Sequence, residues 1–415
     1  MKLAIIGTGI SGNVLGHHLH KDHDITVFEA NDYIGGHTHT HDIALNGRDY
    51  KIDTGFIVFN YQTYPHFIEL LDSLGVEVQK SNMSFSVKCE LTGLEYNGNT
   101  LNSLFAQRRN LFKPSFYRMI RDILRFNKEC PDLLKSDDET ISLGDYLSSN
   151  GYSEKFINFY IVPMGSAIWS SSYQQMMAFP AQFFIRFFVN HGLLNVTDRP
   201  DWYVIKGGSS SYVDKLVAGF KDKIHLKTPV RKVKRFSTHV EISTDDNVAE
   251  KFDAVFFACH SDQALAMIDE PDTLENSVLS AFPYQNNEVV LHTDSSVLPK
   301  RKLAWAAWNY HRTGRLENPV SLTYDMNILQ GIESDDTFCV TLNNTAAIDE
   351  SKIIKRLNYA HPLFTQEGLE AQTRHSELNG NNRCFYAGAY WRYGFHEDGV
   401  VSALKAIADF KEHML

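Results

Sequence analysis

The first residues whose types and spacing could do chemistry are three glycines and an acid. Gly7, Gly9 and Gly12 follow the apolar run KLAII, and Glu29 stands 17 residues beyond Gly12. The first glycine permits a tight turn, the second lets a pyrophosphate approach the backbone, and the third lets the following helix pack closely. An acid at this distance is typical of a site that binds ribose hydroxyls. The spacing therefore predicts a dinucleotide site.

This chemistry needs a strand, a helix and a second strand to position it. We expect a buried strand over residues 2–6, a helix over 10–20 and a strand over 24–30. The N-terminus of the helix would face the pyrophosphate, because its N–H groups and its dipole favour an anion. Glu29 favours an unphosphorylated ribose, which indicates NAD or FAD rather than NADP. The alternative is a glycine-rich turn without a ligand, and the strand–helix–strand context argues against it.

The composition limits the class of protein. The chain has 415 residues, of which 43% are hydrophobic and 22% are charged. These values are typical of a soluble globular enzyme with two domains. The net charge of −10 argues against bulk attraction to nucleic acid. The 27 Phe and 19 Tyr residues suit a large apolar pocket as well as large cores.

Cysteine and histidine usage argues against a metal site. The five cysteines are odd in number and lack CxxC spacing, which indicates a reducing compartment rather than a disulfide frame or a zinc site. His37, His39 and His41 alternate and would share one face of a strand, as metal ligands sometimes do. We prefer a solvated or anion-facing strand, because no second ligand cluster follows. We therefore expect no metal.

The N-terminal apolar run is only about five residues long, too short for a signal peptide. No run approaches the roughly 20 residues that span a bilayer. We expect a cytoplasmic protein, with a peripheral position on the inner face of the membrane as a further possibility to test.

A second group of glycines and acids lies far from the first. The stretch CFYAG predicts a strand near residue 386, and EDG precedes a last helix that we expect over about 400–410. The N-terminus of this helix would be a second anion site. NAD dehydrogenases need no such C-terminal return, whereas FAD is long and is wrapped by segments far apart in the sequence. The pattern therefore favours FAD.

On these residues the chain resembles the flavin amine oxidase/phytoene desaturase superfamily. The resemblance implies an α/β fold, with a Rossmann-like FAD-binding domain of the glutathione-reductase type in three layers and a discontinuous α+β substrate domain. It assigns to the adenosine and diphosphate end of FAD Gly7, Gly9, Ile10, Ser11, Gly12, Glu29, Ala30, Gly36, His37, Thr38 and Val230. It assigns to the flavin ring end Gly55, Phe56, Gly388, Asp398, Gly399 and Val400.

Longer motifs narrow the resemblance. IDTGFIVFN, TYPHFIELLDSLGVE, PMGSAIWS and YGFHEDGVVSA are similar to a bacterial group of FAD-dependent oxidoreductases and to the N-terminal flavoprotein extension of plant cyclopropane fatty acid synthases. The resemblance implies an FAD-dependent oxidoreductase that transfers a hydride between a substrate carbon and flavin N5. It further implies dehydrogenation of modified or methyl-branched membrane fatty acyl chains.

Three positions depart from the pattern of amine oxidases. His37 stands where the wider superfamily commonly has Arg. The stretch YQNNEVVLHTD has no Lys where amine oxidases commonly have one, and Phe395 and His396 stand near the expected position of a Tyr beside the ring. His396 and Tyr393 are candidate catalytic residues, and packing and hydrogen bonding are the alternative roles for both.

Two other functions stay open at this point. The first is an amine oxidase-like enzyme. The second is a non-catalytic flavin-bearing and lipid-binding partner of a fatty-acyl methyltransferase.

The order of the motifs predicts an FAD-binding domain of three segments, 1–80, 200–262 and 375–415. The substrate domain would comprise 81–199 and 263–374. Its first half reads as helical and aromatic, and its second half has strands such as EVVLHTD and TFCVTLN.

Two stretches of the substrate domain stand out. Residues 105–128 carry seven basic residues and one acid, Asp122, with large apolar residues at helical spacing. This pattern predicts either a helix on an anionic membrane surface or an ordinary helix with its apolar face in the core. Residues 179–194 hold phenylalanines at i, i+4 spacing, which would suit either the wall of an acyl tunnel or a plain core helix.

Overall fold

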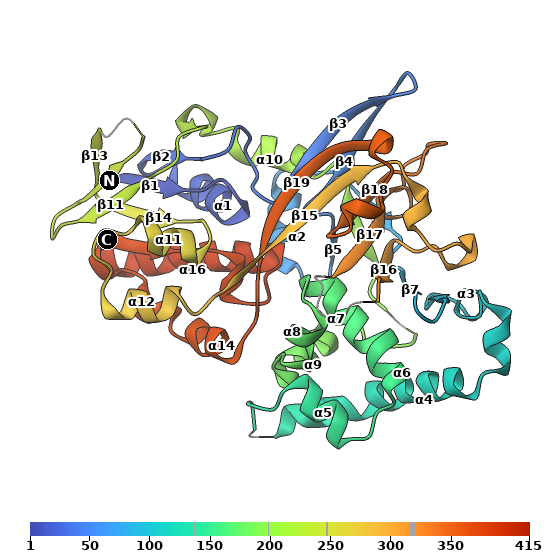
Figure 1. Cartoon of the computed structure of the whole chain (residues 1–415). Coiled ribbons are helices and arrows are strands. Elements are labelled where there is room, and N and C mark those ends of the chain that lie inside the picture. Colours follow the sequence, from blue (N-terminus) through green and yellow to red (C-terminus); the bar gives the residue numbers. More distant parts are fainter. Residues whose placement is uncertain (137, 198, 246–247, 315–319) are drawn as a thin grey trace. The chain divides into compact units, whose positions relative to one another are not determined.

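The computed structural model describes residues 1–136, 138–197, 199–245, 248–314 and 320–415. The chain forms two compact units. Unit 1 comprises Met1–Gln79, Ile205–Pro283 and Glu367–Leu415, and unit 2 comprises Lys80–Val204 and Tyr284–Gln366. Figure 1 shows the elements of each unit coloured along the sequence. In the part of the chain that is described, no helix has the length and apolar character needed to span a membrane.

Unit 1 is built on a parallel sheet. Its order is β10 (Ile224–His225), β2 (Asp24–Phe28), β1 (Lys2–Ile6), β14 (Ala254–Phe257) and β20 (Cys384–Tyr386). Every pair of neighbours is parallel. The strands are apolar runs with few exposed positions, as expected for a parallel sheet covered on both faces. The sequence-predicted strand over 2–6 is confirmed.

Three layers follow from the contacts on the two faces of this sheet. Phe256 and Phe385 are register neighbours on one face, and both contact the ring of Phe410 in α16 (His396–Met414). Phe28 points to the opposite face and contacts Phe252 at 5.9 Å between ring centroids. Phe252 belongs to an antiparallel sheet of β11 (Lys232–Arg235), β12 (Val240–Ser243) and β13 (Ala249–Phe252). Helices, parallel sheet and antiparallel sheet thus form the expected three-layer arrangement.

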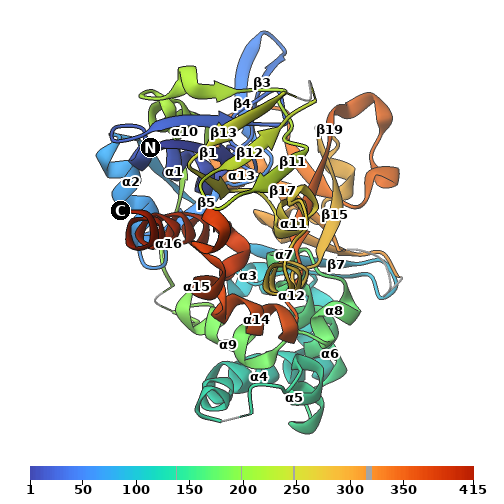
Figure 2. The ribbon, with the colours of Figure 1, turned by 90° about the vertical axis from the view of Figure 1, so that its left-hand side faces the viewer.

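The helical layer brings both ends of the chain together. α1 (Ile10–Leu19) packs beside α16, and both helices are labelled in Figure 2. The other elements of unit 1 are the hairpin β3 (Thr40–Leu45) and β4 (Arg48–Asp53), β5 (Val58–Asn60), α2 (Pro65–Ser73), α10 (Ser210–Val217), α11 (Ser261–Met267), α12 (Thr273–Leu279), α15 (His375–Leu378) and the 3-10 helices η4 (Lys221–Lys223), η9 (Asn381–Arg383) and η10 (Ala389–Trp391). α14 (Gln366–Thr373) begins at the boundary.

Unit 2 is built on a mixed sheet. Its order is β19 (Ile353–Pro362), β15 (Tyr284–His292), β18 (Cys339–Leu342), β17 (Ser321–Asp325), β16 (Trp308–Arg312), β7 (Phe85–Cys89) and β8 (Leu94–Asn97). The pair β16–β7 is parallel and the other pairs are antiparallel. β15 and β18 contain the strands expected from EVVLHTD and TFCVTLN. With its helices, unit 2 is the expected α+β domain.

The helices of unit 2 come mainly from its first segment. They are α3 (Leu101–Leu104), the 3-10 helices η1 (Arg108–Phe112) and η2 (Cys130–Lys135), α4 (Pro114–Glu129), α5 (Leu143–Ser149), α6 (Glu154–Phe156), the π-helix η3 (Ile157–Ile161), α7 (Val162–Trp169), α8 (Tyr173–Met177), α9 (Ala181–Asn190) and α13 (Met326–Gln330). The remaining short elements are β6 (Val78–Ser81), β9 (Trp202–Ile205), η5 (Ser295–Val297), η6 (Lys302–Ala304), η7 (Thr345–Ala347) and η8 (Glu350–Lys352).

Three boundaries differ from the prediction by more than one residue. Residues 200–204 belong to unit 2 and residues 367–374 to unit 1, and the largest shift follows residue 262. Residues 263–283 were expected in the substrate domain, and they belong to unit 1. The reason is a buried carboxylate on α12. Glu275 forms an ion pair with Arg235 of β11 and accepts a hydrogen bond from the Tyr386 hydroxyl of β20 at 3.3 Å. A carboxylate that is 1% exposed needs these partners, so the helix stays with the strands that supply them.

The two stretches of unit 2 singled out in the sequence, residues 105–128 and 179–194, both bury apolar side chains. In residues 105–128 the helix begins only at Pro114, and its apolar face, with Phe116, Met119 and Phe126, is completely buried. In α9 the rings of Phe184 and Phe188 stack at 4.2 Å. Phe179 and Phe187 pack around Trp169 at 4.7 and 4.8 Å. These phenylalanines pack against other aromatic rings. The contacts support a core helix rather than the wall of an acyl tunnel.

Candidate functional site

The glycine turn between β1 and α1 has two kinds of glycine. Gly7 has a φ of +103°, and a Cβ there would lie 2.6 Å from the Ala258 carbonyl oxygen. A Cβ on Gly12 would overlap the carbonyl oxygen of Gly7. These two glycines are required by the fold itself. At Gly9, by contrast, a Cβ would meet no protein atom within 4 Å. Gly9 therefore leaves open space, which suits the close approach of a ligand.

The open space lies at the N-terminus of α1. Gly9 is the N-cap residue, no side chain of a described residue caps it, and the first turn holds no acid. Backbone N–H groups at such an end bind a phosphate. Ser11 was predicted to take part, and its hydroxyl instead donates to the Gly399 carbonyl oxygen at 2.9 Å. In this arrangement Ile10 and Ser11 can offer an anion only their backbone.

Glu29 lies at the end of β2, as expected, and is buried. Its carboxylate accepts hydrogen bonds from the Thr8 N–H at 2.9 Å and the Thr8 hydroxyl at 2.5 Å. It also accepts from the Asn31 N–H at 2.8 Å. Ala30 follows on the exposed side. These bonds aim the carboxylate at the glycine turn, which is where a ribose acceptor is needed.

A second glycine turn lies against the first. Gly36 has a φ of +59°, and a Cβ there would lie 2.9 Å from the Cα of Gly9. The next residue, His37, accepts a hydrogen bond from the Phe56 N–H at its carbonyl oxygen, at 2.7 Å. A Cβ on Gly55 would overlap that same carbonyl oxygen. The structure thus brings predicted diphosphate residues and predicted ring-end residues into direct contact.

Val230 belongs to the same neighbourhood. The Thr228 N–H donates to the Glu29 carbonyl oxygen at 2.8 Å, and the Lys227 N–H donates to the Asn31 carbonyl oxygen at 2.9 Å. Val230 follows two residues later and is buried. The middle segment of the chain is therefore fastened beside Glu29.

The C-terminal segment also reaches the first glycine turn. A Cβ on Gly399 would lie 2.5 Å from Ile10 Cγ2, so only a glycine lets α16 approach α1 this closely. The Gly388 N–H donates to the Ser402 hydroxyl at 2.9 Å, which ties the end of β20 to α16. Val400 is buried. The predicted start of this helix near residue 400 is wrong, because it begins at His396.

The earlier start has a physical cause in two acids of the first turn. Asp398 accepts a hydrogen bond from the Phe395 N–H at 2.9 Å, and its burial raises its pKa to about 7. Glu397 accepts from the N–H groups of His66 and Phe67 at 3.1 and 2.9 Å, at the N-terminus of α2. Acids in a first helical turn are favoured by the helix dipole. Both acids therefore stabilise helix ends.

His396 is buried in an aromatic cluster. Its ring stacks on Phe56 with 3.7 Å between centroids and 9° between planes, and Phe67 meets it edge-on at 5.1 Å. Its Nε2 lies 2.6 Å from the Tyr212 hydroxyl and 3.2 Å from the Thr38 hydroxyl. Burial lowers its pKa to about 3, with the neighbouring His37 as a second cause. The imidazole is therefore neutral at physiological pH.

Sequence reasoning did not single out Phe67 or Tyr212. Tyr212 follows the Gly/Ser turn KGGSSSY at the start of α10, and its hydroxyl also lies 2.8 Å from Thr38 Oγ1. No local pattern distinguishes these two aromatic residues from core residues. Tyr393 is half-buried in the loop before α16, outside the contacts described for His396.

The alternating histidines form ring contacts. His39 stacks on Tyr33 at 3.9 Å and lies 4.1 Å from His41, whose Nε2 is 2.9 Å from the Thr54 hydroxyl. Among the residues that the structure describes, no group of three His, Cys, Asp or Glu side chains is placed to hold a metal ion.

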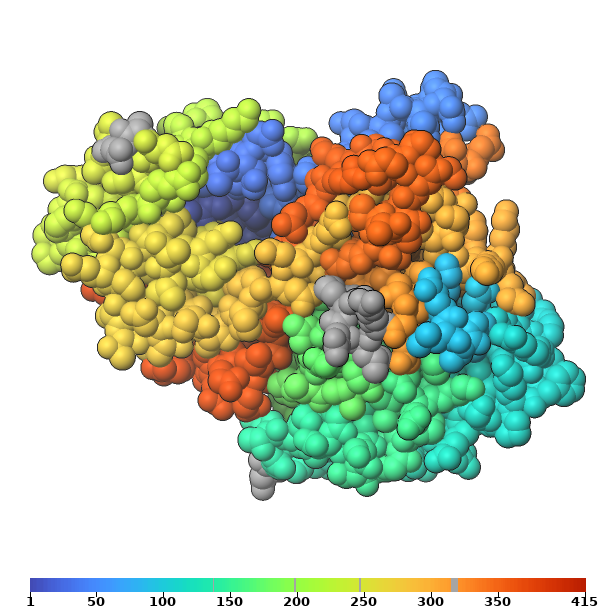
Figure 3. All heavy atoms as spheres, in the orientation of Figure 1, coloured from blue at the N-terminus to red at the C-terminus, as the bar shows by residue number. Residues whose placement is uncertain are grey.

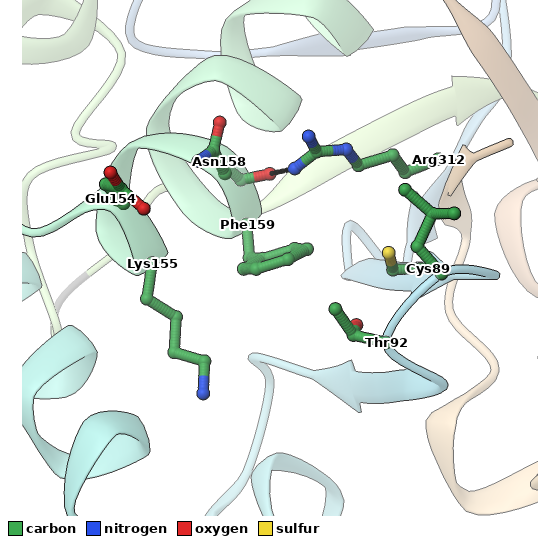
Figure 4. A pocket seen from close by; sticks show the side chains of 8 residues that line it. Cys89, Thr92, Glu154, Lys155, Asn158, Phe159 and Arg312 are labelled. Carbon is green, nitrogen blue, oxygen red and sulfur yellow. Dashed lines mark hydrogen bonds between the residues drawn. The ribbon is translucent and has the colours of Figure 1, made fainter. Parts of the chain in front are cut away.

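Unit 2 contains a separate cavity of about 300 Å³ beside β7, β16 and α6. Figure 4 shows its lining, with Phe159 between Lys155 and Arg312. The Arg312 guanidinium lies 5.3 Å from the centre of the Phe159 ring, and its Nη1 donates to the Asn158 carbonyl oxygen at 3.5 Å. None of the predicted site residues lines this cavity.

All the predicted cofactor residues instead belong to unit 1, although they come from its three separated segments. The residues fit FAD on three grounds. Gly9 leaves open space at an uncapped helix end, Glu29 stands beside that space, and α16 arrives at the same turn through Gly399. The diphosphate would be held by the first turn of α1 and the Gly36 turn, and the ribose by Glu29.

Comparisons with known proteins agree with this fit. The family described as flavin containing amine oxidoreductase matches residues 13–325 of the chain. No protein of curated function matches the chain by sequence.

Solved structures share the fold over nearly the whole chain. A fatty acid isomerase from P. acnes that produces CLA is 16% identical, covers 98% of this chain and 98% of its own, and has a TM-score of 0.70. Cyclohexylamine oxidase from Brevibacterium oxydans is 17% identical, with 99% of each chain covered and a TM-score of 0.68. Putrescine oxidase is 16% identical, with 98% of this chain and 99% of its own covered and a TM-score of 0.67. The chain belongs to the family of flavin-containing amine oxidoreductases, and the protein is an FAD-dependent oxidoreductase.

Proposed function

We propose that this oxidoreductase dehydrogenates modified or methyl-branched acyl chains of membrane lipids. The long motifs IDTGFIVFN and YGFHEDGVVSA resemble those of bacterial oxidoreductases associated with fatty acid modification. A fatty acid isomerase is among the proteins that share the fold, which supports the same class of substrate. A fatty-acyl methyltransferase would supply the methyl branch, so we propose such an enzyme as the partner that acts before this protein.

The observation that carries the proposal is the environment of His396. The imidazole is neutral, stacked on Phe56, and engaged at Nε2 by the Tyr212 hydroxyl. Removal of a hydride from a tertiary or allylic carbon depends on orientation and on exclusion of water more than on a strong base. A neutral, tightly packed histidine among aromatic rings provides an environment of that kind.

The chain's own residues have distinct roles in this proposal. When bound, FAD supplies the acceptor for the hydride and its two electrons. The turns at Gly9 and Gly36 and the carboxylate of Glu29 bind and orient the cofactor. Phe56 and His396 exclude water, and His396 and Tyr393 are the candidates to receive the proton that leaves the neighbouring carbon.

A feature of unit 2 argues against amine oxidation. Amine oxidases of the superfamily commonly carry a lysine in the strand that corresponds to β15, and this strand has Gln285 and Asn287 instead. Asn287 is buried and accepts a hydrogen bond from the Asn343 side chain at 2.8 Å. Side-chain amides therefore occupy this part of the strand.

The test is anaerobic reduction of the purified FAD-loaded protein. We expect phospholipid with methyl-branched unsaturated acyl chains to bleach the absorbance of oxidised flavin. Mass spectrometry should then show an acyl product lighter by two hydrogens, in a yield equal to the flavin reduced. The same lipid with straight saturated chains is the matched control and should react at least about tenfold more slowly, because it lacks the stabilised carbon.

Putrescine and cyclohexylamine complete the set of substrates. Rapid bleaching by either amine, with none by the branched lipid, would contradict the proposal and favour the amine oxidase-like alternative.

A further inference from the structure

We propose that residues 101–129 of unit 2 dock the protein on an anionic membrane surface. This segment comprises α3, η1 and α4, shown in cyan to teal in Figure 1. Figure 3 shows cyan and teal atoms at the surface on the face that is drawn. The inference goes beyond the proposed function, because it does not depend on which substrate the flavin site takes.

The exposed charge of the segment is strongly positive. Asp122, its one acid between residues 105 and 128, is buried and accepts a hydrogen bond from the Ser153 N–H at 3.0 Å. It therefore places no exposed negative group on this surface. Arg125 pairs with Glu129 at 3.8 Å and lies 3.9 Å from the centre of the Tyr152 ring.

The other cations of the segment form no ion pair with a described residue. They are Arg108, Arg109, Lys113, Arg118, Arg121 and Lys128, and we call them the basic surface. Arg108 donates to the carbonyl oxygens of Asn102 and Phe105 at 3.1 and 2.8 Å, and Arg109 donates to that of Gly93 at 2.9 Å. Carbonyl partners hold these guanidinium groups without cancelling their charge. The basic surface is thus available to an anionic partner.

Exposed apolar residues accompany these cations. Phe112 is 87% exposed at the end of η1, and Leu111 beside it is 42% exposed. The Tyr117 hydroxyl donates to the Leu111 carbonyl oxygen at 3.0 Å, which fastens η1 to the first turn of α4. Leu124 of α4 is 51% exposed. Exposed large apolar side chains next to cations are typical of elements that lie in the interface of a bilayer.

The periodicity of α4 divides these residues between two faces. Tyr117, Arg121, Leu124 and Lys128 recur at spacings of four, three and four, so they share one face. Phe116 and Met119 are buried on the other face. The predicted membrane helix is therefore corrected in one respect. The apolar face of α4 packs in the core. In the proposal, the basic face of α4 and the exposed Phe112 at the end of η1 contact the membrane.

The combination favours a membrane over nucleic acid. An exposed Phe112 gains nothing from a phosphate backbone, whereas a bilayer offers both anionic headgroups and an apolar interior. We therefore commit to an anionic lipid bilayer as the partner.

The test is flotation of the FAD-loaded full chain with vesicles. Phosphatidylcholine vesicles are compared with vesicles in which part of the phosphatidylcholine is replaced by phosphatidylglycerol. We expect the partition coefficient for the anionic vesicles to be at least about tenfold higher and to fall as salt is added.

Two variants locate the binding. Arg118→Gln/Arg121→Gln/Lys128→Gln should lower partition to anionic vesicles at least about tenfold. Lys21→Gln/Lys223→Gln/Lys234→Gln removes the same charge from exposed positions of unit 1 and should leave binding nearly unchanged. Phe112→Ser should weaken binding severalfold, while Val196→Ser, also at an exposed apolar position, should not. All variants change exposed residues, and unchanged flavin absorbance and melting temperature verify their folding.

Three outcomes would overturn the proposal. The first is equal binding to the two kinds of vesicle, and the second is equal loss of binding in both triple variants. The third is displacement by double-stranded DNA as effective as displacement by anionic vesicles, which would indicate a general polyanion site.

Discussion

Each unit contains a neutral histidine stacked on a phenylalanine, and the two pairs differ in what they connect. In unit 1, His396 lies 3.7 Å from Phe56, and its Nε2 is bound by the Tyr212 hydroxyl. In unit 2, His191 lies 3.8 Å from Phe187, and its Nδ1 lies 3.0 Å from the carbonyl oxygen of that same residue. Burial lowers the pKa of both histidines, to about 3 and about 4.

The two histidine–phenylalanine contacts are similar in geometry, but they connect different parts of the chain. His191 and its partner are four residues apart, so the contact between them lies within the end of α9 itself. His396 joins residues from three distant parts of the chain, the same parts that carry the predicted FAD residues. We therefore expect changes in the unit 1 group to affect FAD, and equivalent changes in unit 2 to affect stability alone.

The largest expected effect separates a glycine that the fold requires from one that it does not. Gly12→Ala places a Cβ on the Gly7 carbonyl oxygen and should cost about 3 kcal/mol of unfolding free energy. Gly98→Ala in unit 2 places its Cβ where nothing lies within 4 Å and should change stability by less than about 0.5 kcal/mol. Urea unfolding measures both. Similar losses in the two variants would contradict the close packing of α1 on β1.

The next effect concerns the free energy of unfolding at low pH. The unfolded chain protonates His396 as the pH falls below 6.5, while the folded chain does so only near 3. Stability from the neutral histidine is therefore present above pH 6.5 and is lost as the pH falls, by about 2 kcal/mol at pH 5. His396→Gln and His191→Gln should each remove this loss when urea unfolding is compared at pH 7 and pH 5.

Only His396→Gln should also change the visible spectrum of the flavin or the affinity for FAD. Asp398 has the opposite sign, because its raised pKa makes the folded chain progressively more stable as the pH falls from about 7 to 3.8, where the unfolded chain takes up the same proton. Each variant is therefore compared with the unsubstituted protein. Equal flavin spectra in the two variants would break the distinction between the histidine pairs.

A smaller effect is expected at Gly9. Gly9→Ala has room for its Cβ and an ordinary φ of −64°, so the melting temperature of the apoprotein should stay within a degree or two. The methyl group would enter the space left for the diphosphate and should weaken FAD about tenfold, or about 1.4 kcal/mol. Titration of apoprotein with FAD, followed by flavin fluorescence, measures this. Unchanged affinity with unchanged stability would remove the diphosphate from this turn.

The smallest effect compares two buried tyrosines. Tyr212→Phe removes the hydroxyl bound to His396, and Tyr96→Phe removes the one that donates to the Phe159 carbonyl oxygen at 2.5 Å. Each should cost about 1 kcal/mol of stability. Only Tyr212→Phe should alter the affinity for FAD, because Tyr96 lies in unit 2. An altered FAD affinity in Tyr96→Phe would contradict this assignment.

Much of unit 1 could be predicted from the sequence. The strand over 2–6, the acid at the end of β2 and the return of the C-terminal segment to the first turn all agree with the structure. The start of α16 was misplaced by four residues, because adjacent acids such as Glu397 and Asp398 are also common in loops and do not mark a helix by themselves. They stabilise two helix ends only once α2 has been brought beside α16.

The sequence by itself determined where backbone must approach backbone. Glycine is favoured where φ is positive and is needed where two main chains come into near-contact, so Gly7 and Gly12 could be assigned without coordinates. Tertiary structure alone decided the fate of side chains whose pattern suits either a core or a ligand. Phe184 became core, Phe112 stayed exposed, and Asp122 was buried. The physical reason is that helical periodicity defines a face, whereas burial depends on which distant segments cover it.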